Sequence, residues 1–169
     1  MTEDDIRALK KRFDAVWQLR VNDMDDYCAE LALHVLPAAI KTIKNQEKHD
    51  RSAWSKIVDN TGKDSLKTLA AGMVSGTCSP SRKWFTLQAA DESLQKDIEV
   101  RQWLKAVEDA CYVAFSKSNV YRTVHHIYMQ EGAFGIGAAL APEHGRNSKA
   151  QLMDLIPLTF GEFAITTDE

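Results

Sequence analysis

The fold is decided within residues 117–140, which read KSNVYRTVHHIYMQEGAFGIGAAL. Before Gly132 the apolar residues recur three and four positions apart, as on one face of a helix, and after it they alternate as in a strand. Asn119 is suited to cap this helix, which we expect to end at or near Gly132. Gly135 and Gly137 then let the backbone turn and pack closely. This stretch predicts the point at which the chain changes from helices to sheet.

The apolar residues on the N-terminal side of this stretch also follow helical spacing. We predict four further helical regions, at about 3–20, from Asn22 or Asp23 to Pro37, from the turn at 59–62 to Gly76 and Pro80, and from Asp91 to Lys117. The polar residues 41–51 predict an exposed loop that brings Trp54 back to the body. Residues 83–87 alternate, which predicts a short extended piece with Trp84 or Phe85 in the core.

Beyond Gly132, two apolar segments flank a polar loop and predict a hairpin. The segments are 135–141 and 151–156, the loop is 143–149, and a further strand is predicted at 163–167. The predicted fold class is therefore α+β, a mainly helical body (helices over about 3–131) followed by a small antiparallel sheet (about 135–167). A chain of 169 residues is long enough for one domain and too short for two.

The composition is that of a folded globular protein, with 44% hydrophobic and 27% charged residues. No apolar run approaches the roughly 20 residues of a membrane-spanning helix, and the acidic N-terminus has the wrong charge for a signal peptide. We therefore expect a cytoplasmic place of synthesis and no membrane contact. The formal net charge of -3 argues against a dedicated nucleic-acid-binding surface, which usually carries a basic excess.

Two groups of potential metal ligands have simpler structural interpretations. The cysteines are odd in number, widely spaced and set among apolar residues, which favours buried thiols over a disulfide or a metal site. The aspartates fall in the first turn of the second predicted helix, where the helix dipole favours negative charge. The cysteines are Cys28, Cys78 and Cys111, and the aspartates are Asp23, Asp25 and Asp26.

The pair His125 and His126, with Tyr128, Gln130 and Glu131 close behind, suggests acid–base or metal chemistry. Neighbouring residues on a helix point about 100° apart, however, so the two imidazoles cannot easily share one metal. The His-Glu-x-x-His spacing of zinc sites is also missing. We interpret His125 as an interior or interface residue and His126 as an exposed one.

Two further motifs lack the surroundings that their chemistry needs. The glycines of 132–137 follow a helix and precede a strand, which is the reverse of a phosphate-binding loop. Residues 75–79 (SGTCS) contain possible nucleophiles, but neither a G-x-S-x-G elbow nor a preceding strand. The sequence therefore predicts no catalytic, cofactor-binding or metal-ligating residue.

The four tryptophans mostly lie on predicted apolar faces, without the interleaved basic residues of a base-stacking platform. We interpret them as core and subunit-contact anchors. They are Trp17, Trp54, Trp84 and Trp103.

Five short segments, taken in order, resemble the N-terminal part of the head-to-tail connecting (portal) proteins of short-tailed bacteriophages. The resemblance spans about residues 52–169, and the order and spacing of the segments make it specific. The segments are 59–73 (beginning DNTG), 79–87 (SPSRKWFTL), 103–107, 118–121 (SNVY) and 132–137 (GAFGIG).

The resemblance implies a non-enzymatic virion protein, made in the host cytoplasm, with no cofactor. Such proteins form a ring of twelve identical subunits at one capsid vertex, through which DNA is packaged by a terminase motor and later ejected. The implied partners are other copies of the chain, terminase, capsid and tail adaptor proteins, and DNA that passes without sequence-specific binding. Family members continue into stem, clip and crown regions, so we expect residues 1–169 to form a single N-terminal, wing-like portion.

Two other classes of protein also fit these residues. One is a small cytoplasmic enzyme that uses His125, His126, Tyr128 or Glu131 near the glycine turn, and it requires those side chains to converge. The other is a small helical interaction module with an exposed Trp or Tyr patch, and it requires one contiguous apolar surface on a monomer.

Overall fold

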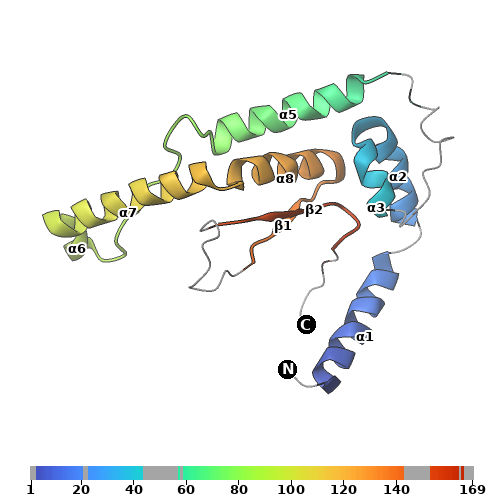
Figure 1. The fold of residues 1–169 in the computed structure, drawn as a ribbon, viewed down its shortest axis with the longest axis horizontal. Helices are drawn as coiled ribbons and strands as arrows, with labels where there is room; N and C mark the ends of the chain where they lie inside the picture. The colour runs from blue at the N-terminus through green and yellow to red at the C-terminus, as the bar shows by residue number, and fades with distance from the viewer. Residues whose placement is uncertain are drawn as a thin grey trace.

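The fold was analysed in a computed structural model that describes residues 3–20, 23–43, 57, 59–142, 153–163 and 165. Helices dominate, and a short hairpin follows them at the C-terminal end (Figure 1). The predicted α+β fold class is confirmed. The elements are α1 (Glu3–Arg20), α2 (Asp23–Val35), η1 (Pro37–Ala39), α3 (Ile40–Ile43), α5 (Thr61–Thr77), α6 (Glu92–Lys96), α7 (Ile98–Lys117), α8 (Val120–Phe134), β1 (Ala138–Leu140) and β2 (Ile156–Leu158).

Helices α5 and α8 lie side by side and form the centre of the body (Figure 1). Gly132 of α8 faces two leucines of α5, because a Cβ built on it would lie 3.0 Å from Leu66 Cδ1 and 3.2 Å from Leu69 Cδ2. This glycine therefore serves close helix packing and lies inside the helix. The helix ends within one turn of it at Gly135, which adopts a φ of 76° and donates its N–H to the Glu131 carbonyl.

A hairpin is confirmed as a two-stranded antiparallel sheet that packs against α8, but its second strand begins at Ile156, where the predicted segment 151–156 ended (Figure 1). Its register pairs Ala138 with Leu158, Ala139 with Pro157 and Leu140 with Ile156. The loop at 143–149 lies outside the described residues. The further strand predicted at 163–167 is wrong where the structure describes it, because Phe163 and Ile165 belong to no strand.

Two contacts hold the hairpin against α8. The Asn119 side chain accepts the Leu155 N–H at 2.9 Å and donates to the Leu155 carbonyl at 2.7 Å. Asn119 is the N-cap residue, as predicted, but its side chain makes no capping bond because it binds the chain that leads into β2. Before β1, a Cβ built on Gly137 would lie 2.5 Å from the Ile127 carbonyl oxygen. The first contact joins residues 36 positions apart in the sequence, and the second packs the start of the hairpin onto the helix that precedes it.

The main hydrophobic core lies where α2, α3 and the C-terminal segment meet. Its buried members are Ala29, Ala32, Ala39, Ile43 and Phe160. Phe134, the last residue of α8, stacks on Phe160 with ring centroids 4.9 Å apart. The small alanines let the backbones approach, and the phenylalanine pair connects α8 to the same core.

The exposed loop predicted over 41–51 is wrong at its start. Residues 41–43 belong to α3, and Ile43 is buried in the core. Ile40 and Ile43 are one helical turn apart, a pattern too short to stand out among polar neighbours. Residues 44–51 and Trp54 lie outside the described part of the chain.

The long helical region predicted from Asp91 to Lys117 is divided at Asp97 into α6 and α7. The Asp91 carboxylate accepts the Ser93 N–H at 2.9 Å, and the Asp97 carboxylate accepts the Glu99 N–H at 2.9 Å. Each aspartate caps the helix that follows it, and the backbone at Asp97 is extended. The apolar spacing continues across this cap, which is why the sequence predicted one helix.

Residues 83–87 run along α7 and belong to no strand. The Tyr112 hydroxyl accepts the N–H groups of Trp84 at 2.7 Å and Phe85 at 2.8 Å, and it donates to the Phe85 carbonyl at 2.9 Å. The Phe85 and Tyr112 rings stack with centroids 4.6 Å apart. One α7 side chain therefore supplies hydrogen bonds that a neighbouring strand would otherwise make. Of the two aromatic residues predicted to enter the core, Phe85 is half-buried and Trp84 is exposed.

Helix α1 extends away from the rest of the body (Figure 1). Its predicted bounds of about 3–20 are confirmed. The acidic residues Glu3 and Asp4 stand in its first turn, where the helix dipole favours them. No helix within the described ranges combines the length and the apolar content needed to cross a bilayer.

Candidate functional site

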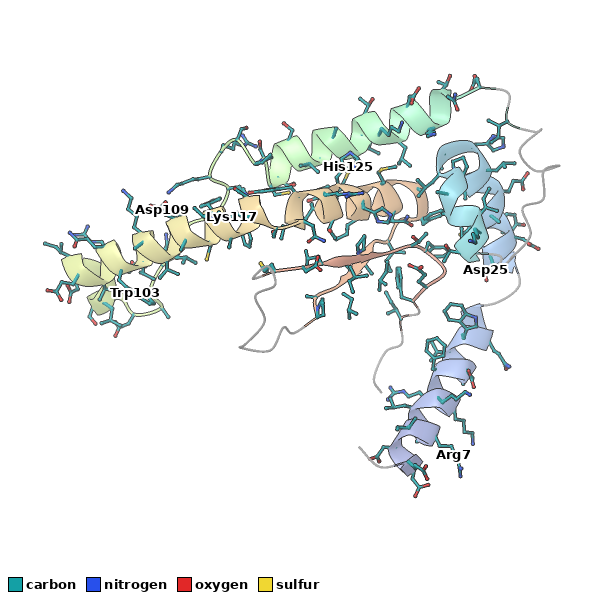
Figure 2. The ribbon with its side chains drawn as sticks, in the orientation of Figure 1. Arg7, Asp25, Trp103, Asp109, Lys117 and His125 are labelled. Atoms are coloured by element: carbon teal, nitrogen blue, oxygen red, sulfur yellow. The ribbon has the colours of Figure 1, made fainter. Side chains whose placement is uncertain are left out.

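The side chains considered for catalysis share α8 but do not converge. The Tyr128 hydroxyl lies 2.8 Å from Thr77 Oγ1 of α5. His126 instead interacts electrostatically with Glu162 of the C-terminal segment, whose charge acts to raise the pKa of His126. Positions 126 and 128 are about 200° apart around a helix, so these side chains point to opposite sides. His125 is half-buried on α8 (Figure 2), and Glu131 is exposed. The enzyme hypothesis needs these groups together, and this geometry separates His126 from Tyr128.

The prediction that His126 is exposed is wrong. Its side chain is half-buried, and its Nδ1 has no hydrogen-bond partner in the described part of the chain. Burial lowers the pKa of His126 below the ordinary value of 6.5, against the opposing charge of Glu162 and with a further contribution from His125. The folded protein therefore favours the neutral imidazole.

A shift from about pH 7.5 to about pH 5.5 should destabilise the wild type more than a His126→Gln variant. The pKa of His126 is lower in the folded than in the unfolded protein, so protonation of its imidazole favours the unfolded state. The contribution of the neutral imidazole to stability is complete above pH 6.5 and is lost as the pH falls toward the folded pKa. Urea denaturation at both pH values measures the free energy of unfolding. Tyr128→Phe, which keeps both histidines on the same helix, is the control. The same pH dependence in the wild type and His126→Gln would contradict this expectation.

Gln130 has a structural role that the sequence did not reveal. Its side chain is only 1% exposed, and its Oε1 accepts the Phe160 N–H at 3.1 Å. It thereby ties α8 to the C-terminal segment. Thr123, seven residues earlier and 2% exposed, lies on the same side of the helix. In the sequence, only the spacing of seven residues between Thr123 and Gln130, which places them on one face of a helix, marked this position.

Replacing Gln130 with leucine should lower the free energy of unfolding by about 1 to 2 kcal/mol, because the buried Phe160 N–H loses its acceptor. Urea denaturation measures the change. Gln102 is exposed on α7, so Gln102→Leu is a matched control with an expected effect below about 0.5 kcal/mol. Equal effects at both positions would show that the Gln130 hydrogen bond adds no stability.

The hydroxyl groups of residues 75–79 take part in local structure. Thr77 Oγ1 bonds to the Tyr128 hydroxyl, and Ser79 Oγ lies 2.9 Å from Ser81 Oγ. The glycines of 132–137 are likewise used for helix packing and for the turn into β1. The Thr77 and Ser79 hydroxyls and these glycines therefore have structural roles in the fold.

The potential metal ligands also have structural positions. The three cysteines, Cys28, Cys78 and Cys111, form no disulfide bond, and only Cys78 among them is buried. Asp25 and Asp26 lie in the first turn of α2, where capping was predicted. Within the described ranges, no group of three or more His, Cys, Asp and Glu side chains has a geometry that could hold a metal ion.

The three tryptophans within the described residues are not buried in the core. Trp103 is 64% exposed, Trp84 is 37% exposed and Trp17 is half-buried. Trp54 lies outside the described residues. The predicted role in the core is therefore wrong for Trp84 and Trp103, and their role in subunit contacts stays a prediction.

Exposed apolar side chains occur on several elements, and two helices each carry a row of them. The first surface, named the α1 face, consists of Ile6, Leu9 and Phe13. The second, named the α7 face, consists of Trp103, Ala106, Ala110 and Val113. Each large side chain in them is more than half exposed, and no described helix or strand covers either face. Figure 2 places Trp103 near the end of α7 that is far from α1. Exposed apolar surfaces of this kind mark sites of contact with other proteins.

A charged cluster lies on another side of α7. Lys83 Nζ donates to Glu108 at 3.1 Å and also to Asp109. Glu108 is 8% exposed, and its second oxygen accepts the Leu87 N–H at 3.3 Å. The hydrogen bonds to Asp109 and Glu108 raise the pKa of Lys83, and the Lys83 ammonium lowers the pKa of Asp109. The sequence did not distinguish the buried Glu108 from the exposed charges around it.

Comparison with known proteins places the chain in a family. Residues 7–169 match the family described as bacteriophage head to tail connecting protein. The chain belongs to this family. A probable portal protein of Bordetella phage BPP-1 is 34% identical over 140 residues, which are 82% of this chain and 24% of that protein. The portal protein of Salmonella phage epsilon15 is 29% identical over 143 residues, which are 85% of this chain and 26% of that protein.

This head-to-tail connecting chain thus spans about a quarter of the length of the curated relatives that it matches. The resemblance seen in the five ordered segments is confirmed, and the family is a structural one. For a structural family member, the α1 face and the α7 face are the candidate functional surfaces.

Proposed function

We propose that this chain is the N-terminal, wing-like portion of a portal subunit, a structural virion protein that joins head and tail. The family match over residues 7–169 carries the proposal, together with two relatives whose names state that they are portal proteins or probable ones. The chain covers about a quarter of the length of those relatives. The function of a whole portal protein is therefore part of what we propose.

The proposed assembly is a ring of twelve copies at one capsid vertex. In a closed ring each subunit uses two different surfaces, one toward each neighbour. The α1 face and the α7 face, on separate helices, are suited to such contacts. The interaction-module hypothesis requires one contiguous patch, and two separated faces fit it less well (Figure 1).

DNA would pass through this ring during packaging and ejection without sequence-specific binding. The net charge of -3 supports passage, because tight binding of the phosphate backbone usually needs a basic surface. The proposed protein partners are terminase, capsid and tail adaptor proteins. Synthesis would take place in the host cytoplasm, before incorporation into the virion.

Immunogold labelling of phage heads whose tails have been removed tests this function. Antibodies against the chain should label a single vertex of each head, whereas antibodies against the major capsid protein, the control, should label the whole surface. Native mass spectrometry of the protein released from heads should give an assembly of twelve copies. Absence of the chain from heads, or label spread over the capsid, would refute the proposed function.

A further inference from the structure

We propose that the α1 face of one copy packs antiparallel along the α7 face of the neighbouring copy. The proposal rests on the proposed function, because it assigns the two surfaces through which subunits of the ring touch. Residue spacing, side-chain size and charge along the two helices each support this pairing.

The α7 face has the spacing of a helix-packing seam. Its four residues follow one another at i, i+3, i+7 and i+10, so they form a single stripe along the helix. Other sides of α7 are occupied within the chain, where Tyr112 and Glu108 bind residues 83–87. The stripe lies on the opposite side of the helix, where a partner can reach it.

The α1 face repeats the same spacing. Its three residues stand at i, i+3 and i+7, and the half-buried Val16 continues the pattern at i+10. The two stripes match over their whole length in one antiparallel register. That register places Ile6 opposite Val113, Leu9 opposite Ala110, Phe13 opposite Ala106 and Val16 opposite Trp103.

The side chains in this register are complementary in size. Leu9 and Phe13 of α1 meet Ala110 and Ala106 of α7, so that a large side chain lies over a small one at each central level. The helices are also similar in length, with 18 residues in α1 and 20 in α7, or roughly 27 Å and 30 Å. The pair can therefore pack along most of both helices.

The charges favour the antiparallel direction. In the matched register Glu3, in the acidic first turn of α1, lies within a turn of Lys117 at the end of α7. Antiparallel helices also oppose their dipoles, which a parallel pair would align. A parallel arrangement would instead bring the acidic first turns of both helices together.

A second copy is the occupant that the arrangement of the chain favours. Within one molecule, α1 and the Trp103 end of α7 lie at opposite ends of the body (Figures 1 and 2). The α1 face of a neighbouring copy can pack on the α7 face of this copy. The resulting pair still has one unoccupied α1 face at one end and one unoccupied α7 face at the other. The contact is heterologous, and it can repeat until a ring closes.

Photo-crosslinking in the assembled ring tests this contact. Benzoylphenylalanine replaces Phe13 in rings built from mixed isotopically light and heavy copies, and irradiation should link the probe to a different copy near Ala106. The same probe at Tyr27, which is 74% exposed on α2 and outside both faces, is the control and should not label α7. Links confined to one polypeptide, links elsewhere on the neighbour or links to a different protein would overturn the proposal.

A charge placed in the α7 face provides an independent measurement. Ala110→Asp should weaken self-association about tenfold or more, because the carboxylate would be buried under Leu9 of the neighbour. Leu140→Asp, at a residue 54% exposed on β1, is the matched control and should leave assembly unchanged. Normal rings with Ala110→Asp would overturn this contact and leave the proposed function standing. A wild-type protein that forms no rings and is absent from heads would refute the proposed function itself.

Discussion

Replacement of Gly137 by alanine is expected to lower the free energy of unfolding by about 3 kcal/mol. The added Cβ would lie 2.5 Å from the Ile127 carbonyl oxygen and 2.8 Å from Ile127 Cγ2. A backbone oxygen inside a helix cannot rotate away as the end of a flexible side chain can. The hairpin would have to move off α8, and urea denaturation followed by circular dichroism measures the resulting loss.

Gly72 is the matched control for this substitution. It lies inside α5, and a Cβ built on it has no atom within 4 Å. Gly72→Ala should therefore raise the free energy of unfolding by about 0.5 to 1 kcal/mol, the usual gain for alanine over glycine in a helix. A loss below about 1 kcal/mol in Gly137→Ala would show that the hairpin is not held tightly against α8.

Replacement of Tyr112 by phenylalanine is expected to lower the free energy of unfolding by about 2 to 3 kcal/mol. The hydroxyl accepts the N–H groups of Trp84 and Phe85 and donates to the Phe85 carbonyl. The variant keeps the aromatic ring that stacks on Phe85, so it removes these hydrogen bonds alone. Urea denaturation gives the loss of stability, and faster hydrogen exchange at the two amides locates it.

Tyr121 provides the control for the hydroxyl group. Its hydroxyl accepts a long hydrogen bond, 3.4 Å from Trp84 Nε1. Tyr121→Phe should therefore change the free energy of unfolding by less than about 0.5 kcal/mol. Equal losses of stability in the Tyr112 and Tyr121 variants would show that the hydrogen bonds between Tyr112 and residues 83–87 add no particular stability.

These contacts stabilise the body of the subunit, whereas the two apolar faces lie on helices at its ends. Tyr112 and the proposed assembly surface share α7, on different sides of the helix. Ala110→Asp is therefore expected to remove the proposed contact between copies without removing the fold, and the stability and assembly measurements separate these two effects.

Most helices and the hairpin could be predicted from the sequence, because their apolar spacing is a local property. The change from helix to sheet after Gly132 was visible for the same reason. The short helix α3 and the cap at Asp97 were missed. Each depends on a contact or a cap that outweighs the local pattern, such as the burial of Ile43 beside Phe160.

The sequence by itself determined the α+β fold class, the positions of most helices and the family. The spacing of apolar residues and the order of short motifs are properties of the sequence alone. Only the tertiary structure decided which side chains are buried and which surfaces stay uncovered. His126, Gln130 and Glu108 are polar residues whose burial depends on segments distant in the sequence, and Trp103 is an apolar residue that nothing in the described chain covers. Burial depends on three-dimensional neighbours, and those neighbours exist only after the helices have packed.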